Sequence, residues 1–137
     1  MNFYPSERKE RLTLSQAIVK YWQAQYSEYD GVEQRFIQGI WGLFGHGNVS
    51  GLSQALVEYG HDLPYHKPCN EQSMVHASTG FARAKRRKAT MACTTSIGPG
   101  ATNMITGAAT ANICRIPVLL LPSDSVSYTH LRAHETP

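Results

Sequence analysis

The chain has 137 residues, of which 42% are hydrophobic and 17% charged, a balance that excludes an intrinsically disordered protein and fits one ordinary domain or a piece of a larger one. No apolar run reaches the roughly 18–20 residues that a membrane span needs, and residues 1–8 lack the order of a secretory signal. The formal net charge is +3, but five of the 13 basic residues lie in the run 83–88, which is typical of solvated surface at a helix end rather than of a nucleic-acid interface.

The three cysteines predict a reducing compartment. Cys69, Cys93 and Cys114 are an odd number, lack CxxC spacing, and fall in or beside apolar segments. This pattern is typical of packing residues with free thiols. We therefore expect a cytoplasmic protein.

The first half of the chain predicts two helices and two strands. Residues 13–26 open with a capping-box pattern, Thr13 with Gln16 three residues on, and continue with apolar residues at helical spacing. The polar segment 27–34 predicts no regular element. Residues 40–44 read as a buried strand that ends in glycines, 52–59 as a short amphipathic helix, and 63–66 as a weak strand because Pro64 removes a ladder donor.

The second half repeats this alternation. Residues 71–85 predict a helix, 89–94 a strand, 101–113 a helix and 117–121 an apolar strand. Strands that are continuously apolar and separated by helices indicate a parallel sheet with helices on both faces, an α/β fold. Ligands of such sheets gather at the carboxyl ends of the strands, which here means the loops 45–51, 68–71 and 95–100.

Residue types alone leave these loops open to two interpretations. The glycines of 96–103 permit close backbone approach to a ligand, but the spacing is neither GxGxxG nor GxxxxGK[ST], so the loop is equally an ordinary strand-to-helix turn. His46 can serve a ligand or satisfy a loop carbonyl. Glu71, at the start of a predicted helix, is by itself best explained as a capping residue favoured by the helix dipole.

Metal and nucleophile sites find little support. His61, His66 and His76 lack the spacing of a zinc site, and no metal site is predicted within the chain. No GxSxG motif occurs, and Cys93 lies inside a predicted strand.

Three motifs together carry a resemblance that none carries alone. They are FGHGNV at 44–49, NEQ at 70–72 followed by ASTGFAR at 77–83, and SIGPGATN at 96–103. In this order and spacing they resemble the amino-terminal, pyrimidine-binding domain of thiamine-diphosphate enzymes of the acetohydroxyacid synthase type, which has a flavodoxin-like fold. YDGVEQRF at 29–36 and RIPVLLLP at 115–122 add a likeness to the branch that hydrolyses a ring C–C bond of a trihydroxycyclohexane-1,2-dione in inositol breakdown.

The resemblance implies roles for particular residues. Glu71 would hydrogen-bond to N1′ of the aminopyrimidine of thiamine diphosphate, and would need to carry or share a proton there. Gln72 would face the reacting centre. The other implied positions are Gly98, Pro99 and Asn103 against the cofactor, and Gly45, His46, Gly47 and Asn48 along the substrate approach, with His46 as a proton carrier or a structural residue.

The resemblance also sets expectations for what surrounds this chain. Mg²⁺ and the diphosphate would be held by a separate carboxyl-terminal domain, in a homodimer or homotetramer whose site lies between subunits. Residues 1–124 would be a partial, truncated pyrimidine-binding domain that is inactive alone. Residues 125–137 resemble translated adapter or vector sequence and are excluded from the fold.

Two alternatives stay open at this point. A carboligase of the acetohydroxyacid synthase type, acting on 2-oxo acids, would share Glu71 and differ in its substrate groups. A flavodoxin-like binding module would use Glu71 only as a helix cap.

Overall fold

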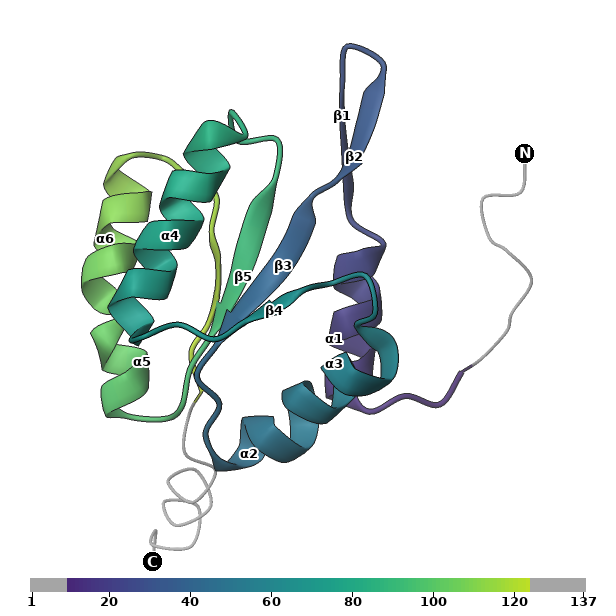
Figure 1. Cartoon of the computed structure of the whole chain (residues 1–137), viewed down its shortest axis with the longest axis vertical. Helices are drawn as coiled ribbons and strands as arrows, with labels where there is room; N and C mark the ends of the chain where they lie inside the picture. The colour runs from purple at the N-terminus through teal and green to yellow at the C-terminus, as the bar shows by residue number, and fades with distance from the viewer. Residues whose placement is uncertain (1–9, 124–137) are drawn as a thin grey trace, which may run out of the picture.

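The computed structural model describes residues 10–123. A helix and a hairpin come first, and strands then alternate with helices (Figure 1). The elements are α1 (Leu14–Gln23), β1 (Tyr26–Tyr29), β2 (Val32–Arg35), β3 (Ile37–Gly42), α2 (His46–Asn48), the π-helical turn η1 (Val49–Ser53), α3 (Gln54–Tyr59), β4 (Tyr65–His66), α4 (Glu71–Ala84), β5 (Thr90–Thr94), α5 (Pro99–Asn103), α6 (Ile105–Ile113) and β6 (Leu119–Leu121). None of the helices in this range is both long and apolar enough to cross a membrane. The boundary expected at residue 124 and the tail 125–137 lie outside the described residues.

Four parallel strands form the central sheet, in the order β4-β3-β5-β6. Counted along the chain, this is second, first, third, fourth, which matches the first four strands of the flavodoxin-like order. The predicted α/β fold is confirmed. Because the chain leaves β3 in one direction and passes back across it to reach β5, the winding reverses between these two strands.

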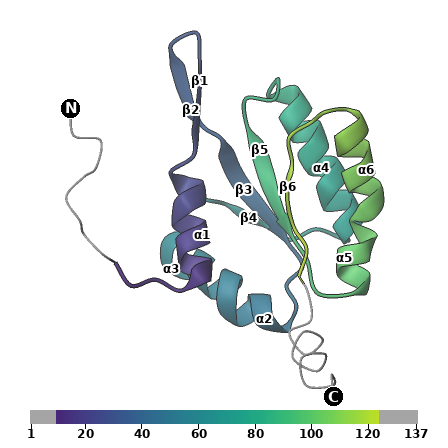
Figure 2. The same ribbon diagram turned by 180° about the vertical axis from the view of Figure 1, so that it is seen from behind.

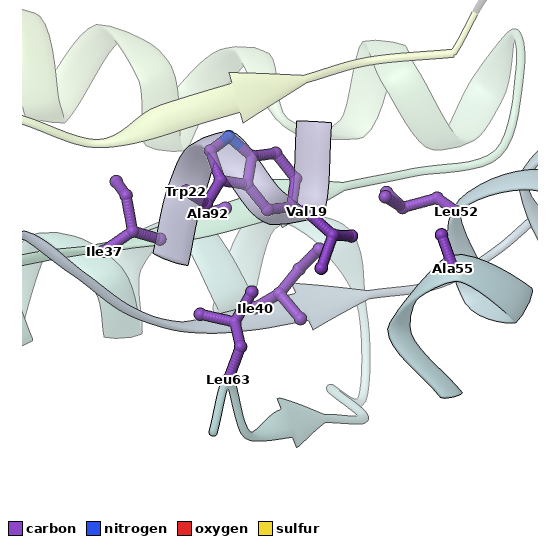
Figure 3. Packing of buried hydrophobic residues seen from close by; sticks show 8 residues of the cluster. All are labelled: Val19, Trp22, Ile37, Ile40, Leu52, Ala55, Leu63 and Ala92. Carbon is purple, nitrogen blue, oxygen red and sulfur yellow. The ribbon is translucent and has the colours of Figure 1, made fainter. Parts of the chain in front are cut away.

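Helices cover both faces of the sheet (Figures 1 and 2). Ile40 of β3 joins the cluster under α1 and α3, whereas its neighbour Trp41 packs against the cluster under α4, because successive strand side chains point to opposite faces. The first cluster, drawn in Figure 3, contains Val19, Trp22, Ile37, Ile40, Leu52, Ala55, Leu63 and Ala92. The second contains Met74, Val75, Cys93 and Met104. The strands are thus held from both sides.

The capping box at the start of α1 is confirmed. The Gln16 backbone N–H donates to Thr13 Oγ1 over 3.3 Å, and the Thr13 backbone N–H donates to Gln16 Oε1 over 2.9 Å. Two backbone donors that have no partner inside the helix are satisfied in this way.

The polar segment 27–34 belongs to a β-hairpin, which the sequence pattern did not predict. β1 and β2 pair antiparallel around Asp30 and Gly31, whose φ values of 51° and 72° are those of a type I′ turn. The hairpin stands away from the sheet in Figure 1 and is attached at its base by Ser27 Oγ, which donates to the Lys88 carbonyl over 2.5 Å. Most of its side chains are exposed, so the alternation that marks a half-buried strand is missing.

Element boundaries differ from expectation where proline sits. β4 and β6 begin only after Pro64 and Pro117, which have no N–H to give to a ladder. The helix expected at 101–113 is two helices, α5 and α6, and α5 begins at Pro99, a favoured first helical position. These shifts move element ends by a few residues and leave the topology unchanged.

Candidate functional site

Three loops meet at the carboxyl edge of the sheet. β4, β3 and β5 are parallel neighbours, so the loops after them leave from the same edge and enter α4, α2 and α5 respectively. The winding reversal between β3 and β5 lies at this edge, where folds of this kind bind their ligands. The structure therefore brings together the three loops that the sequence singled out.

Gly45 lets two of these loops touch. A Cβ at Gly45 would lie 2.9 Å from Ser96 Cβ and 3.1 Å from Ser96 Cα, closer than carbon atoms pack without repulsion. The φ of Gly45 is −98°, which any residue can adopt. Glycine is thus needed here for space rather than for backbone freedom.

Asn48 fastens the first loop to the sheet. Its Nδ2 lies 3.1 Å from Thr94 Oγ1 and 3.3 Å from the Thr95 carbonyl, and it also contacts Ser123 Oγ. Ser123 Oγ in turn donates to the Thr95 carbonyl over 2.6 Å. The amide assigned to the substrate approach therefore holds α2 against the ends of β5 and β6.

His46 and Gly47 follow Gly45 in this loop. His46 is the first residue of α2, and Gly47 is exposed, with open space within 4 Å of where its Cβ would be. Both lie at the same edge as Gly45.

Asn70, and not Glu71, caps α4. Asn70 has extended backbone geometry, and its Oδ1 accepts from the Ser73 backbone N–H over 2.8 Å. Glu71 is the first residue of the helix, and its carboxylate is directed to α5 instead of to the free N–H groups. The interpretation of Glu71 as the capping residue is therefore wrong, although the positive end of the helix dipole still favours a negative charge there.

Two residues of α5 seat the Glu71 carboxylate. Asn103 Nδ2 donates to Glu71 Oε2 over 2.8 Å. Gly100 is buried beside it, and a Cβ there would lie 3.1 Å from Glu71 Oε1 and 2.3 Å from Ser96 Oγ. The sequence analysis noted the glycines of this loop but did not assign Gly100 to the cofactor, although its three-residue spacing from Asn103 puts both on one helical face.

An open hollow surrounds this carboxylate. Gly98, at the start of α5, has a φ of 58°, which favours glycine, and no atom lies within 4 Å of where its Cβ would be. Glu71 is half-buried at this surface. The lining residues are Glu71, Gly98, Pro99, Gly100, Thr102 and Asn103, so the four positions expected against a cofactor are grouped in one place.

Gln72 lies apart from the hollow. It is half-buried, and its Nε2 is 3.4 Å from Nε2 of His76, one turn further along α4.

Thr95, in the loop before α5, was not anticipated: its hydroxyl is fully buried and finds no hydrogen-bond partner among residues 10–123. A buried hydroxyl in that state is short of one polar contact.

Cys93 is a packing residue. Burial raises the pKa of its thiol to about 11, partly offset by a 3.1 Å hydrogen bond with Ser78 Oγ. A thiol in this environment is a poor nucleophile. Within residues 10–123, no group of three His, Cys, Asp or Glu side chains is placed to hold a metal ion together.

Comparison with known proteins gives this geometry a context. Residues 29–136 match the family described as thiamine pyrophosphate enzyme, N-terminal TPP binding domain. A protein of Bacillus thuringiensis (strain Al Hakam) named 3D-(3,5/4)-trihydroxycyclohexane-1,2-dione hydrolase is 55% identical over 114 residues, which is 83% of this chain and 18% of the relative. Proteins of the same name from Bacillus cereus (strain 03BB102) and Bacillus anthracis (strain CDC 684 / NRRL 3495) are 55% and 54% identical over the same shares. The chain thus spans about a fifth of the length of these relatives.

Proposed function

The chain belongs to the thiamine pyrophosphate enzyme family, through its N-terminal TPP-binding domain, and from this premise we propose that it supplies the aminopyrimidine half of a thiamine diphosphate site. The full enzyme would hydrolyse trihydroxycyclohexane-1,2-dione, as the names of its relatives suggest. Cleavage of a ring C–C bond and a place in inositol catabolism are what the sequence resemblance implies. The observation that carries the proposal is the Glu71 carboxylate, seated on α5 at the carboxyl edge of a parallel sheet.

The hollow fits the pyrimidine half of the cofactor. A flat ring with nitrogen atoms at its edge needs a surface without bulky side chains and one group that can share a proton with a ring nitrogen. Gly98, Pro99 and Gly100 provide such a surface, and Glu71 provides the acid beside it. The arrangement supports cofactor binding through Glu71, Gly98, Pro99 and Asn103.

The bound cofactor would supply a carbon nucleophile and an electron sink for the substrate carbonyl. Glu71 would hold a proton between its carboxyl and N1′ of the aminopyrimidine. His46 would carry protons at the substrate side, since an imidazole exchanges them near neutral pH. Gly45 and Gly47 would border the substrate approach, which Asn48 keeps in place, and Gln72 would act from the adjoining turn of α4.

Other parts of the site are assigned by resemblance. We place the diphosphate and Mg²⁺ on a separate domain, and the working site between subunits of a homodimer or homotetramer. The three free cysteines support a cytoplasmic setting.

A chimera tests this function. The matching segment of the Bacillus cereus relative is replaced by this chain, and hydrolysis of the dione is measured with saturating thiamine diphosphate and Mg²⁺. We expect activity in the chimera and a loss of about 100-fold or more in kcat/KM on Glu71→Gln, the scale of a lost proton-transfer group. Glu58→Gln is the matched control, because Glu58 is exposed on α3 and, within residues 10–123, bonds only to Gln16 and Gln54.

Two results would count against the proposal in different ways. Full activity in the Glu71→Gln chimera would remove Glu71 from the chemistry. A chimera that binds thiamine diphosphate but leaves the dione intact would contradict the hydrolase assignment and favour a 2-oxo acid carboligase.

A further inference from the structure

We infer that Asn103 is a positioning residue for Glu71, and that its carboxamide holds the acid over Gly100 both when Glu71 is ionised and when it carries a proton. This inference rests on the proposed function, which requires Glu71 to hold and release a proton in one place. It assigns to Asn103 a role that acts through Glu71, in addition to any contact with the cofactor.

One turn of helix locates both oxygens of the carboxylate. Gly100 and Asn103 are three residues apart in α5 and therefore lie on the same face. Gly100 leaves room for Oε1, which a Cβ would approach to 3.1 Å, while Asn103 Nδ2 reaches Oε2 at 2.8 Å. The side chain of Glu71 thus packs against Gly100 and is hydrogen-bonded by Asn103.

A carboxamide suits a partner that changes its protonation state. An ionised carboxylate only accepts hydrogen bonds, so the Asn103 NH₂ group must face it. A protonated carboxyl has an O–H that needs an acceptor, and a half-turn of the same amide presents Oδ1. An ionised aspartate at 103 could not donate, and a lysine could not accept.

The position of Glu71 makes this dual capacity useful. The carboxylate lies against α5 and away from the free N–H groups of α4, so its hydrogen bonding depends on Asn103. A partner able only to donate would bond to the ionised form alone. Asn103 can hydrogen-bond to the Glu71 side chain in either of its protonation states.

The test uses the full 137-residue chain without cofactor, labelled for NMR. Glu71 rotamers are measured from three-bond couplings, and contacts between residue 103 and the Glu71 γ-protons from NOEs. We expect one dominant rotamer in the wild type and averaging over several in Asn103→Leu. Asn103 is exposed, so neither this variant nor Asn103→Asp should impair folding.

Asn103→Asp adds a readout that a purely structural role would not change. At neutral pH two carboxylates repel, and we expect the Glu71 side chain to swing away. On acidification one proton can be shared between the two groups, and the contact should return. Thr102→Val is the matched control, because Thr102 lines the same hollow and its hydroxyl donates to the Gly98 carbonyl, its one side-chain hydrogen bond in the described part of the chain.

An unchanged single rotamer of Glu71 in both Asn103 variants would overturn the inference, as would a contact in Asn103→Asp that does not respond to pH. Because no cofactor is present, either result would leave the proposed function standing. Conversely, an inactive chimera would not alter the NMR result.

Discussion

The two edges of the sheet use glycine and arginine in opposite ways. At the carboxyl edge, Gly45 and Gly100 occupy places where a Cβ would press on Ser96 or Glu71. At the amino edge, Arg86 and Arg115 stand in the left-handed region, with φ values of 53° and 51°, where glycine would cost less. The contrast teaches that lack of space requires glycine at the edge that carries the site, whereas the opposite edge keeps arginine where the backbone alone would favour glycine.

The amino edge ends its two helices in the same manner. In α4 the Arg87 N–H donates to the Ala82 carbonyl and the Arg86 N–H to the Arg83 carbonyl, over 2.8 and 3.0 Å. At the end of α6 the Ile116 N–H donates to the Ala111 carbonyl and the Arg115 N–H to the Asn112 carbonyl, over 2.9 and 3.0 Å. Both are Schellman motifs, whose left-handed position is usually glycine. The basic run 83–88 lies here, mostly exposed, as expected for a helix carboxyl end.

Among the substitutions that test this comparison, a methyl group at Gly45 should change the free energy of unfolding most. Gly45→Ala forces the loops after β3 and β5 apart, and we expect a loss of about 1–3 kcal/mol in the free energy of unfolding, the scale of overpacking. Gly47→Ala should change it by less than about 0.5 kcal/mol, because open space surrounds that position. Urea unfolding measures both, and equal effects would show that Gly45 is not needed for space.

Replacing an arginine at the amino edge with glycine should instead raise the free energy of unfolding. Arg115→Gly relieves a left-handed backbone but gives up a charge near a helix carboxyl end, so we expect a net gain of about 0.5 kcal/mol. Arg83→Gly is the control: Arg83 lies inside α4, where glycine costs about 1 kcal/mol. A destabilising Arg115→Gly would mean that the arginine side chain contributes more than its backbone costs.

The smallest effect on stability should come from the ion pair between Arg35, at the end of β2, and Asp62. Hydrogen bonds from Arg35 and Gln23 lower the pKa of the Asp62 carboxyl below its ordinary value. A lowered pKa stabilises the fold above the ordinary carboxylate range, and this contribution is lost as pH falls through the folded-state pKa. Asp62 is exposed and Arg35 half-buried, so the ion pair contributes less than about 1 kcal/mol to the free energy of unfolding.

Asp62→Asn should therefore lower the thermal midpoint slightly at neutral pH, and the difference should disappear as the pH falls below the ordinary carboxylate range. The measurement is thermal melting of both proteins across this range. A difference that persists unchanged at acid pH would exclude the ion pair as its cause.

Much of the fold could be predicted because burial leaves a direct trace in the sequence. β5 is buried along its whole length, and its apolar run identifies it. The hairpin was missed because both of its faces are largely exposed, yet Asp30-Gly31 between two short runs is a known turn signal. Hydrophobic periodicity indicates an element with a buried face, and it cannot detect an element that has none.

The site could be predicted in outline but not in its contacts. Parallel strands place Glu71 and the glycine loop at one edge, which follows from topology alone. The cap of α4 is a local signal that could have been found, because asparagine is a preferred N-cap residue and Asn70 bonds only three residues ahead. The contact of Asn103 with Glu71 depends instead on how α5 and α6 pack against α4. A Cβ at Gly107 would lie 2.6 Å from Val75 Cβ, and so close an approach of two helices has no signature in a single sequence.

The most direct measurement of the central claim is exchange of the C2 proton of thiamine diphosphate for deuterium in the chimera, followed by NMR with and without Glu71→Gln. If Glu71 shares a proton with the aminopyrimidine, the substitution should slow exchange by about 100-fold or more, while Glu58→Gln leaves it unchanged. Exchange within a few-fold of wild type in the Glu71→Gln chimera would contradict the assignment of this acid.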